Sequence, residues 1–228
     1  MDTGLAFLPL MLCLALEPSR VELTPICPDV DADCRMLSVA DLFDRVIQHS
    51  SRIHSLSTDL YVDLEKYFRS SRNDLDKTAH KCHTSTFQTP NGKENVQKIP
   101  REELTLLIMS LLGAWKGPLS EFHRNIGNYR DLSETGQSKA QEIGHLMWEL
   151  EMGLEKVAAK MQSLGIISNS LTGRTLLSSS SAAAAGLSTE EDALLNDYQL
   201  LHCFRRDTNK VQSYLNVLKC RTVPENSC

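Results

Sequence analysis

Two short motifs combine residue types that could bind a metal ion. Glu142 and His145 have the Glu-x-x-His spacing of di-iron four-helix bundles. That site needs a second such pair and two more inward glutamates, and the sequence holds no other Glu-x-x-His. Residues 80–83, with the sequence HKCH, are not followed by a second half with zinc-ligand spacing. We therefore expect no metal site and no cofactor.

The sequence also lacks the motifs of common enzyme chemistry. It contains neither Gly-x-Ser-x-Gly nor a glycine-rich loop that could cradle phosphate. His49 falls on an apolar stripe as a residue of the core edge, and His54 is expected to point outward. A net charge of −5 without a long basic run argues against nucleic-acid binding, and 41% hydrophobic residues argue against a multi-span membrane protein. We expect a protein that is not an enzyme.

The first residues suggest the compartment. Residues 5–16, LAFLPLMLCLAL, form a short apolar run before a polar stretch. This pattern favours a secretory leader in residues 1–22, followed by one helical domain in residues 23–228. A membrane anchor is the competing interpretation, but the run is short and contains Pro9. We expect a secreted, extracellular protein with no membrane insertion after leader removal.

The cysteine count fits secretion. Leader removal takes Cys13 and leaves an even number, which in a secreted chain implies disulfides. Two pairs are close in sequence, each near a chain end, and the third pair is what remains. The expected pairs are Cys27 with Cys34, Cys220 with Cys228, and Cys82 with Cys203. Metal ligation is the alternative use of these thiols.

Four stretches carry apolar residues at helical spacing. The first begins near Ser38, which has capping-box-like spacing to Asp41, and runs to about residue 69. The second covers residues 100–126, with a kink expected at Gly117-Pro118; the third passes through residues 140–161, and the fourth covers residues 190–221. The first and third connections are long and the middle one is short. The sequence therefore predicts an all-α four-helix bundle of up-up-down-down, long-chain cytokine topology with two long crossover connections.

Two features within these helices allow two interpretations each. Ile47, His54 and Tyr61 are seven residues apart and line up beside the main apolar stripe. They widen the core face, which periodicity favours, or they form a lateral contact strip. Gly153 lies off the centre of the third stripe, so either something packs closely against it or it has no role. The polar side of the fourth helix, which includes His202, Arg206 and Lys210, is likewise either a solvated face or a contact face.

Four segments resemble one family of hormones: Leu42–Arg45 (LFDR), Cys82–Ser85 (CHTS), Leu200–Asp207 (LLHCFRRD) and Val217–Arg221 (VLKCR). The chain is similar to the prolactin and growth-hormone family over essentially all of its length after the leader. The N-terminal Cys27–Cys34 pair favours the prolactin branch, because growth hormones lack it. The alternatives are a growth-hormone or somatolactin type and, more distantly, a metal-binding four-helix bundle. The Ser/Ala-rich linker in residues 168–188 departs from the family pattern.

The resemblance implies a monomeric secreted hormone that brings together two ectodomains of a single-span cytokine-type receptor, the prolactin receptor, and so triggers kinase-linked signalling. It implies a first receptor surface on the first helix, the following connection and the fourth helix. That surface comprises Ile47, His54, Tyr61, Lys93, Tyr198, His202, Arg205, Arg206, Lys210 and Tyr214. It implies a second receptor surface between the first and third helices, comprising Asp44, Val46 and Gly153.

Two consequences follow from the resemblance. Prolactins often carry three histidines on the first surface, and here Ser51 and Asn209 stand at two of those positions, which leaves His54. We therefore expect a shallower loss of receptor affinity between neutral and mildly acidic pH. Gly153 becomes a flat spot that a receptor backbone can approach.

Overall fold

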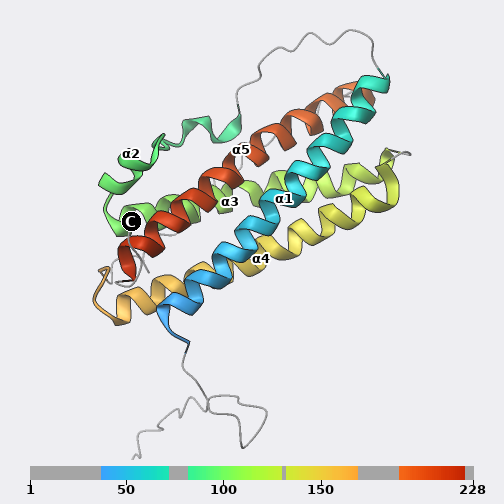
Figure 1. Ribbon diagram of the computed structural model, residues 1–228. Helices are drawn as coiled ribbons and strands as arrows, with labels where there is room; N and C mark the ends of the chain where they lie inside the picture. Colours follow the sequence, from blue (N-terminus) through green and yellow to red (C-terminus); the bar gives the residue numbers. More distant parts are fainter. Residues whose placement is uncertain (1–36, 72–81, 130–131, 169–189, 224–228) are drawn as a thin grey trace, which may run out of the picture. The chain divides into compact units, whose positions relative to one another are not determined.

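The computed structural model describes residues 37–71, 82–129, 132–168 and 190–223 of the 228-residue chain (Figure 1). The predicted leader, the predicted Cys27–Cys34 pair and Cys228 lie outside these residues. Leu37–Cys228 cluster as one compact unit. Within its described parts, no helix combines the length and the apolar character needed to cross a bilayer.

Four long helices form a bundle: α1 Val39–Ser71, α3 Arg101–Asn125, α4 Ser133–Ser163 and α5 Glu190–Thr222. The connection between α1 and α3 contains the 3-10 helix η1 (His83–Thr86) and the short helix α2 (Lys93–Lys98). A second 3-10 helix, η2 (Ile126–Asn128), lies between α3 and α4. In Figure 1, α1 and α3 run in one direction and α4 and α5 run in the other. The predicted four-helix bundle with up-up-down-down topology is confirmed.

The packing of the bundle follows from these directions. α1 packs against α4 and α5, and α3 packs against the same two helices. Each of these four contacts therefore joins antiparallel neighbours. The core between them is apolar and includes side chains with no exposed surface, among them Leu60, Leu111, Leu154, Phe204 and Leu215. Burying one such leucine stabilises the fold by about 1.5–3 kcal/mol.

The start of α1 is a reciprocal capping box. The backbone N–H of Asp41 donates to Ser38 Oγ (3.1 Å), and the backbone N–H of Ser38 donates to Asp41 Oδ2 (3.0 Å). The Ser38 hydroxyl also donates to Asp41 Oδ2 (2.7 Å). These bonds occupy two N–H groups that the helix itself leaves without partners, an arrangement worth about 1 kcal/mol. The helix start predicted from Ser38 and Asp41 is confirmed.

The buried face of α1 differs slightly from the predicted stripe. Phe43, Val46, Ile53, Leu60 and Leu64 are buried at steps of three, four or seven residues. Leu42 and His49, which the apolar spacing also places on this side of the helix, are only partly buried and lie at the edge of that face. The prediction that His49 is a core-edge residue is therefore confirmed.

Helix α3 continues through Pro118, as the apolar spacing that resumes in register after Gly117-Pro118 predicted. The kink expected at these two residues stays a prediction. Proline has no N–H, so the carbonyl of Ala114, four residues earlier, has no donor within the helix. His83 of η1 lies at that point, with its Nε2 3.2 Å from the Ala114 oxygen. A side chain of the connection thus replaces the hydrogen bond that the proline removes.

Candidate functional site: two helical surfaces

Aromatic and cationic side chains meet where α1 lies beside α5. The Tyr61 and Tyr198 hydroxyls are 2.6 Å apart and their rings stack with centroids 5.1 Å apart. The Arg205 guanidinium lies 4.2 Å above the Tyr61 ring, in the geometry of a cation–π contact. His202 is exposed, with its ring 6.0 Å from that of Tyr61. We call these four residues the seam cluster.

The Ile47, His54 and Tyr61 strip follows the same seam. Ile47 is partly buried against the core, and Tyr61 is buried. The expectation that His54 points outward is wrong, because its ring is partly buried and its Nδ1 lies 3.1 Å from Thr208 Oγ1 on α5. Burial lowers the pKa of His54 below its ordinary value of 6.5, and the nearby Arg205 charge lowers it further. A hydrogen bond from the His54 ring to the Arg205 backbone acts in the opposite direction.

Three further residues of α5 face the connection that follows α1. They are Arg206, Lys210 and Tyr214, spaced four residues apart on one side of the helix. Lys210 Nζ donates to Thr89 Oγ1 (2.7 Å), and the Tyr214 hydroxyl donates to the Pro90 carbonyl (2.8 Å). We call these three residues the connection-facing stripe.

Burial perturbs two groups of this stripe. It lowers the pKa of Lys210, and the nearby Arg206 charge lowers it further. It also raises the pKa of the Tyr214 phenol. Only 2% of Tyr214 is exposed, so this residue supports the connection from beneath. Of the stripe, Arg206 and Lys210 keep partly exposed side chains that could contact a partner.

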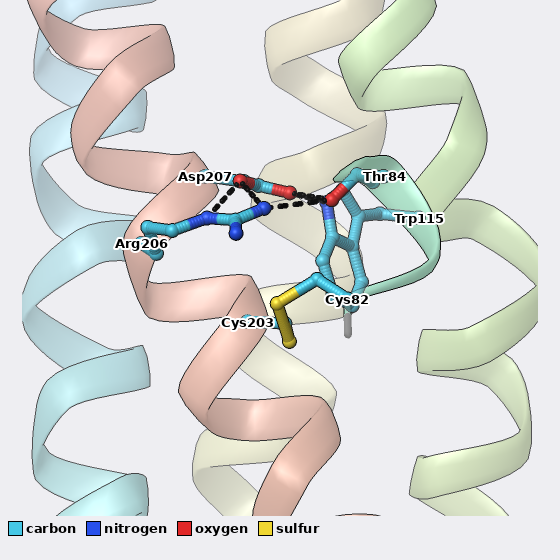
Figure 2. Close-up of a disulfide and its surroundings, with 6 residues drawn as sticks. All are labelled: Cys82, Thr84, Trp115, Cys203, Arg206 and Asp207. Atoms are coloured by element: carbon cyan, nitrogen blue, oxygen red, sulfur yellow. Dashed lines mark hydrogen bonds and ion pairs between the residues drawn. A yellow bond between two sulfur atoms is a disulfide. The ribbon is translucent and has the colours of Figure 1, made fainter. Parts of the chain in front are cut away.

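A buried carboxylate, that of Asp207, holds Arg206 of the connection-facing stripe against the connection. Figure 2 shows Asp207 between Arg206 on one side and Thr84 and Trp115 on the other. Asp207 Oδ1 accepts from Arg206 Nε (2.9 Å) and Nη2 (2.7 Å). Asp207 Oδ2 accepts from the Thr84 hydroxyl (2.5 Å) and from Trp115 Nε1 (3.2 Å). Arg206 Nη2 also donates to Thr84 Oγ1 (3.0 Å), which closes the network.

A disulfide joins the same two segments one helical turn away. Cys82 and Cys203 are bonded across a sequence separation of 121 residues, with their Cα atoms 5.6 Å apart, which confirms the predicted pair (Figure 2). In the chain-entropy model, a loop of that length stabilises the fold by about 5 kcal/mol. Cys220 is also disulfide-bonded; its predicted partner, Cys228, lies outside the described residues.

A hollow borders the connection-facing stripe. It has a volume of about 550 Å³ and lies between α2 with the segment before it and α5. Lys93, the first residue of α2, is exposed and lines the hollow together with Lys210 and Tyr214. The structure thus gathers residues of the predicted first surface on one side of α5.

The predicted second surface lies in a different contact, where α1 crosses α4. An ideal Cβ on Gly153 would lie 2.6 Å from Val46 Cγ1, which is closer than real Cβ atoms come. Gly153 therefore has a role within the protein, since it lets α1 approach α4, and Val46 is buried against it. Asp44 is exposed and bonds Lys219 of α5 (2.5 Å), so its carboxylate is engaged by another helix.

The Glu142-x-x-His145 motif lies on the outside of the bundle. Glu142 accepts from Arg52 Nε of α1 at 2.8 Å. The His145 side chain is 66% exposed, with its Nδ1 3.6 Å from Glu149 Oε2. A di-iron site would need both residues to project inward. Glu142 instead bonds Arg52 of α1, and His145 lies near Glu149 of its own helix.

Two buried carboxylates of α5 were not expected from the sequence. Asp207 is one; Asp197, of which 4% is exposed, accepts from the Tyr129 hydroxyl at 2.7 Å. Burial raises the pKa of Asp197 to about 6, against the lowering effect of bonds from Tyr129 and Asn125. The apolar spacing nevertheless indicates that both aspartates are buried, because each lies three positions after one apolar residue of the core-facing side of α5 and four positions before another.

A comparison of the sequence with protein-family models gives a match to one family. The model described as the Somatotropin hormone family matches residues 8–228. The match therefore covers nearly the whole chain, including every helix described above.

Proposed function

Because the chain belongs to the somatotropin hormone family, whose members are secreted, non-enzymatic helical hormones that bind cytokine-type receptors, we propose that it is a prolactin-like hormone. Its receptor is the prolactin receptor, and one hormone molecule brings two receptor ectodomains together. Signalling then passes to a kinase associated with the receptor. The alternative within the family is that the chain is a hormone of the growth-hormone or somatolactin type.

The observation that carries the proposal is the arrangement of α1, the connection and α5. The seam cluster joins Tyr61 of α1 to residues of α5 that are more than a hundred positions away in the sequence. The exposed parts of Arg206 and Lys210 lie on the same side of α5. Tyrosine and arginine are the residue types enriched in binding hot spots. The adjoining hollow, with Lys93 at its edge, adds a concave feature that a receptor side chain can enter.

The second receptor surface is proposed at the α1–α4 crossing around Gly153. A glycine there keeps the crossing close, because residue 153 adds no side chain of its own where Val46 packs. This crossing uses a different pair of helices from the α1–α5 seam. One hormone molecule therefore offers two separate faces, as bridging of two receptors requires.

Receptor bridging is tested by mixing the secreted protein with prolactin-receptor ectodomains and measuring complex mass by light scattering. We expect a complex of one hormone with two ectodomains at receptor excess. Growth-hormone-receptor ectodomains form the comparison arm. A preference for those, or the absence of any complex, contradicts the proposed receptor.

The second surface is tested with Gly153→Arg, which we expect to bind one ectodomain but not two. Because any side chain at this position meets Val46, Gly153→Ala is needed to separate the packing change from the projecting arginine. Gly144→Arg is the matched control, since it adds the same charge to α4 at a glycine with nothing within 4 Å of an ideal Cβ. Two-receptor complexes with Gly153→Arg, at wild-type affinity, refute the placement of the second surface.

A further inference from the structure

The connection after α1 follows α5 in register. Along the connection, Cys82, Thr84, Thr89 and Pro90 meet, in that order, residues 203, 206–207, 210 and 214 of α5. The four contacts use a disulfide, a buried carboxylate, an ammonium and a phenol. Only the Asp207 contact also engages a third segment, because Trp115 belongs to α3. Asp207 is therefore the point at which the connection, α3 and α5 are held together.

We propose that Asp207 is a positioning residue of the first receptor surface: it fixes the Arg206 guanidinium and the η1 segment in the arrangement that the receptor contacts. The inference rests on the proposed function. It adds a residue that is not itself a contact, since Asp207 is 1% exposed and lies between Arg206 and Thr84 (Figure 2).

The geometry gives the carboxylate this role. A free arginine side chain loses rotamer entropy when it is held in one conformation. Here Nε and Nη2 are already bound to Asp207 and Nη2 also to Thr84, so much of that loss is met on folding rather than on binding. Among the described residues, no contact engages Nη1, which leaves its donors for a partner. The Arg206 side chain is 39% exposed, as a contact residue must be.

Only a carboxylate satisfies this position. Thr84, Trp115 and Arg206 all present donors to the two oxygens of Asp207. An asparagine there replaces one acceptor oxygen with an NH₂ group that must face one of those donors. Asp207→Asn therefore releases Arg206 or Thr84 while barely changing the volume of the side chain.

The experiment compares the full secreted protein carrying Asp207→Asn with the wild type by surface plasmon resonance on the receptor ectodomain. Asp197→Asn is the matched control, since it neutralises another buried aspartate of α5 that bonds Tyr129 away from both surfaces. Arg206→Ala and the double variant that combines Arg206→Ala with Asp207→Asn complete a double-mutant cycle. NMR observation of the Arg206 Nε–H reports its hydrogen exchange without any receptor.

We expect Asp207→Asn to raise Kd at least about tenfold, mainly through faster dissociation. Asp197→Asn should stay within about twofold of the wild type. If Asp207 acts through Arg206, the double variant should bind no more than about threefold more weakly than Arg206→Ala alone. Arg206 Nε–H should exchange slowly in the wild type and in Asp197→Asn, and rapidly in Asp207→Asn.

An unchanged Kd for Asp207→Asn, or slow Arg206 exchange in that variant, overturns the proposal. If Asp207→Asn does not fold, Thr84→Val decides, since it removes one hydroxyl of the network and should still raise Kd by at least about threefold. A wild-type affinity for Thr84→Val then counts against the proposal. If the wild type binds no receptor, the proposed function fails, and the exchange of Arg206 still decides whether Asp207 fixes this side chain.

Discussion

The buried carboxyl of Asp197 makes stability depend on pH in a direction opposite to that of most aspartates. The perturbation is Asp197→Asn, which keeps the size of the side chain and an oxygen that can accept from Tyr129. In the wild type, burial raises the pKa of Asp197 from 3.8 to about 6 in the folded state. The unfolded chain has the ordinary value, because burial is lost.

The magnitude follows from that difference in pKa. Each unit corresponds to about 1.4 kcal/mol, so a rise from 3.8 to about 6 corresponds to about 3 kcal/mol. Between these two pH values, the folded protein binds a proton at Asp197 that the unfolded chain does not. The contribution of this group is therefore fully present below about pH 3.8 and is lost as pH rises through about 6.

The assay is urea unfolding of both proteins at several pH values between 4 and 8. We expect Asp197→Asn to gain stability relative to the wild type as pH rises, by about 2.5 kcal/mol between pH 4 and pH 8. Any pH-independent effect of the substitution cancels in this comparison. Asp59→Asn, at an exposed position on α1, is the control and should show no such trend. A difference between Asp197→Asn and wild type that is constant from pH 4 to pH 8 refutes the reasoning.

Three other outcomes are expected. Replacing both Cys82 and Cys203 by serine should lower the free energy of unfolding by about 2–5 kcal/mol, measured by urea denaturation; an unchanged midpoint contradicts the role of the crosslink. Because the pKa of His54 is lowered in the fold, the unfolded chain takes up the proton more readily, so stability falls as pH drops below about 6.5; His54→Gln should lose that acid-side decline, as thermal unfolding can show. Leu154→Ala should cost about 2–5 kcal/mol, measured by the same urea method, since Leu154 is fully buried; a loss below about 1 kcal/mol argues against tight packing there.

The sequence was most informative where a repeated pattern is averaged over many residues. Apolar spacing predicted α1, α3, α4 and α5 to within a few residues, and connection lengths then predicted their directions. Ser38 and Asp41 marked the start of α1, because a capping box depends only on neighbours in the chain. Because the apolar spacing resumes in register after Pro118, it also predicted correctly that α3 continues.

The sequence was least informative where a contact depends on the meeting of distant segments. His54 was expected to point outward, yet Thr208 of α5 lies against it, and periodicity within α1 cannot show which helix covers its flank. Gly153 was left open because its explanation, Val46, is on another helix. Asp207 and Asp197 stand at apolar positions of α5, but their donors Thr84, Trp115 and Tyr129 are known only from the fold. The assignment of residues to two receptor surfaces stays a prediction.

The bond between His83 and the Ala114 carbonyl couples the effects of mutations at two distant positions, residues 83 and 118. With proline at position 118, losing the imidazole leaves a backbone oxygen without a donor from the protein. With an ordinary residue at 118, helix α3 supplies its own N–H, and the imidazole becomes dispensable for that oxygen. The cost of a substitution at either position therefore depends on the residue at the other. A substitution at residue 83 therefore costs more stability while residue 118 is proline than after residue 118 has changed, so the order in which the two mutations arise matters.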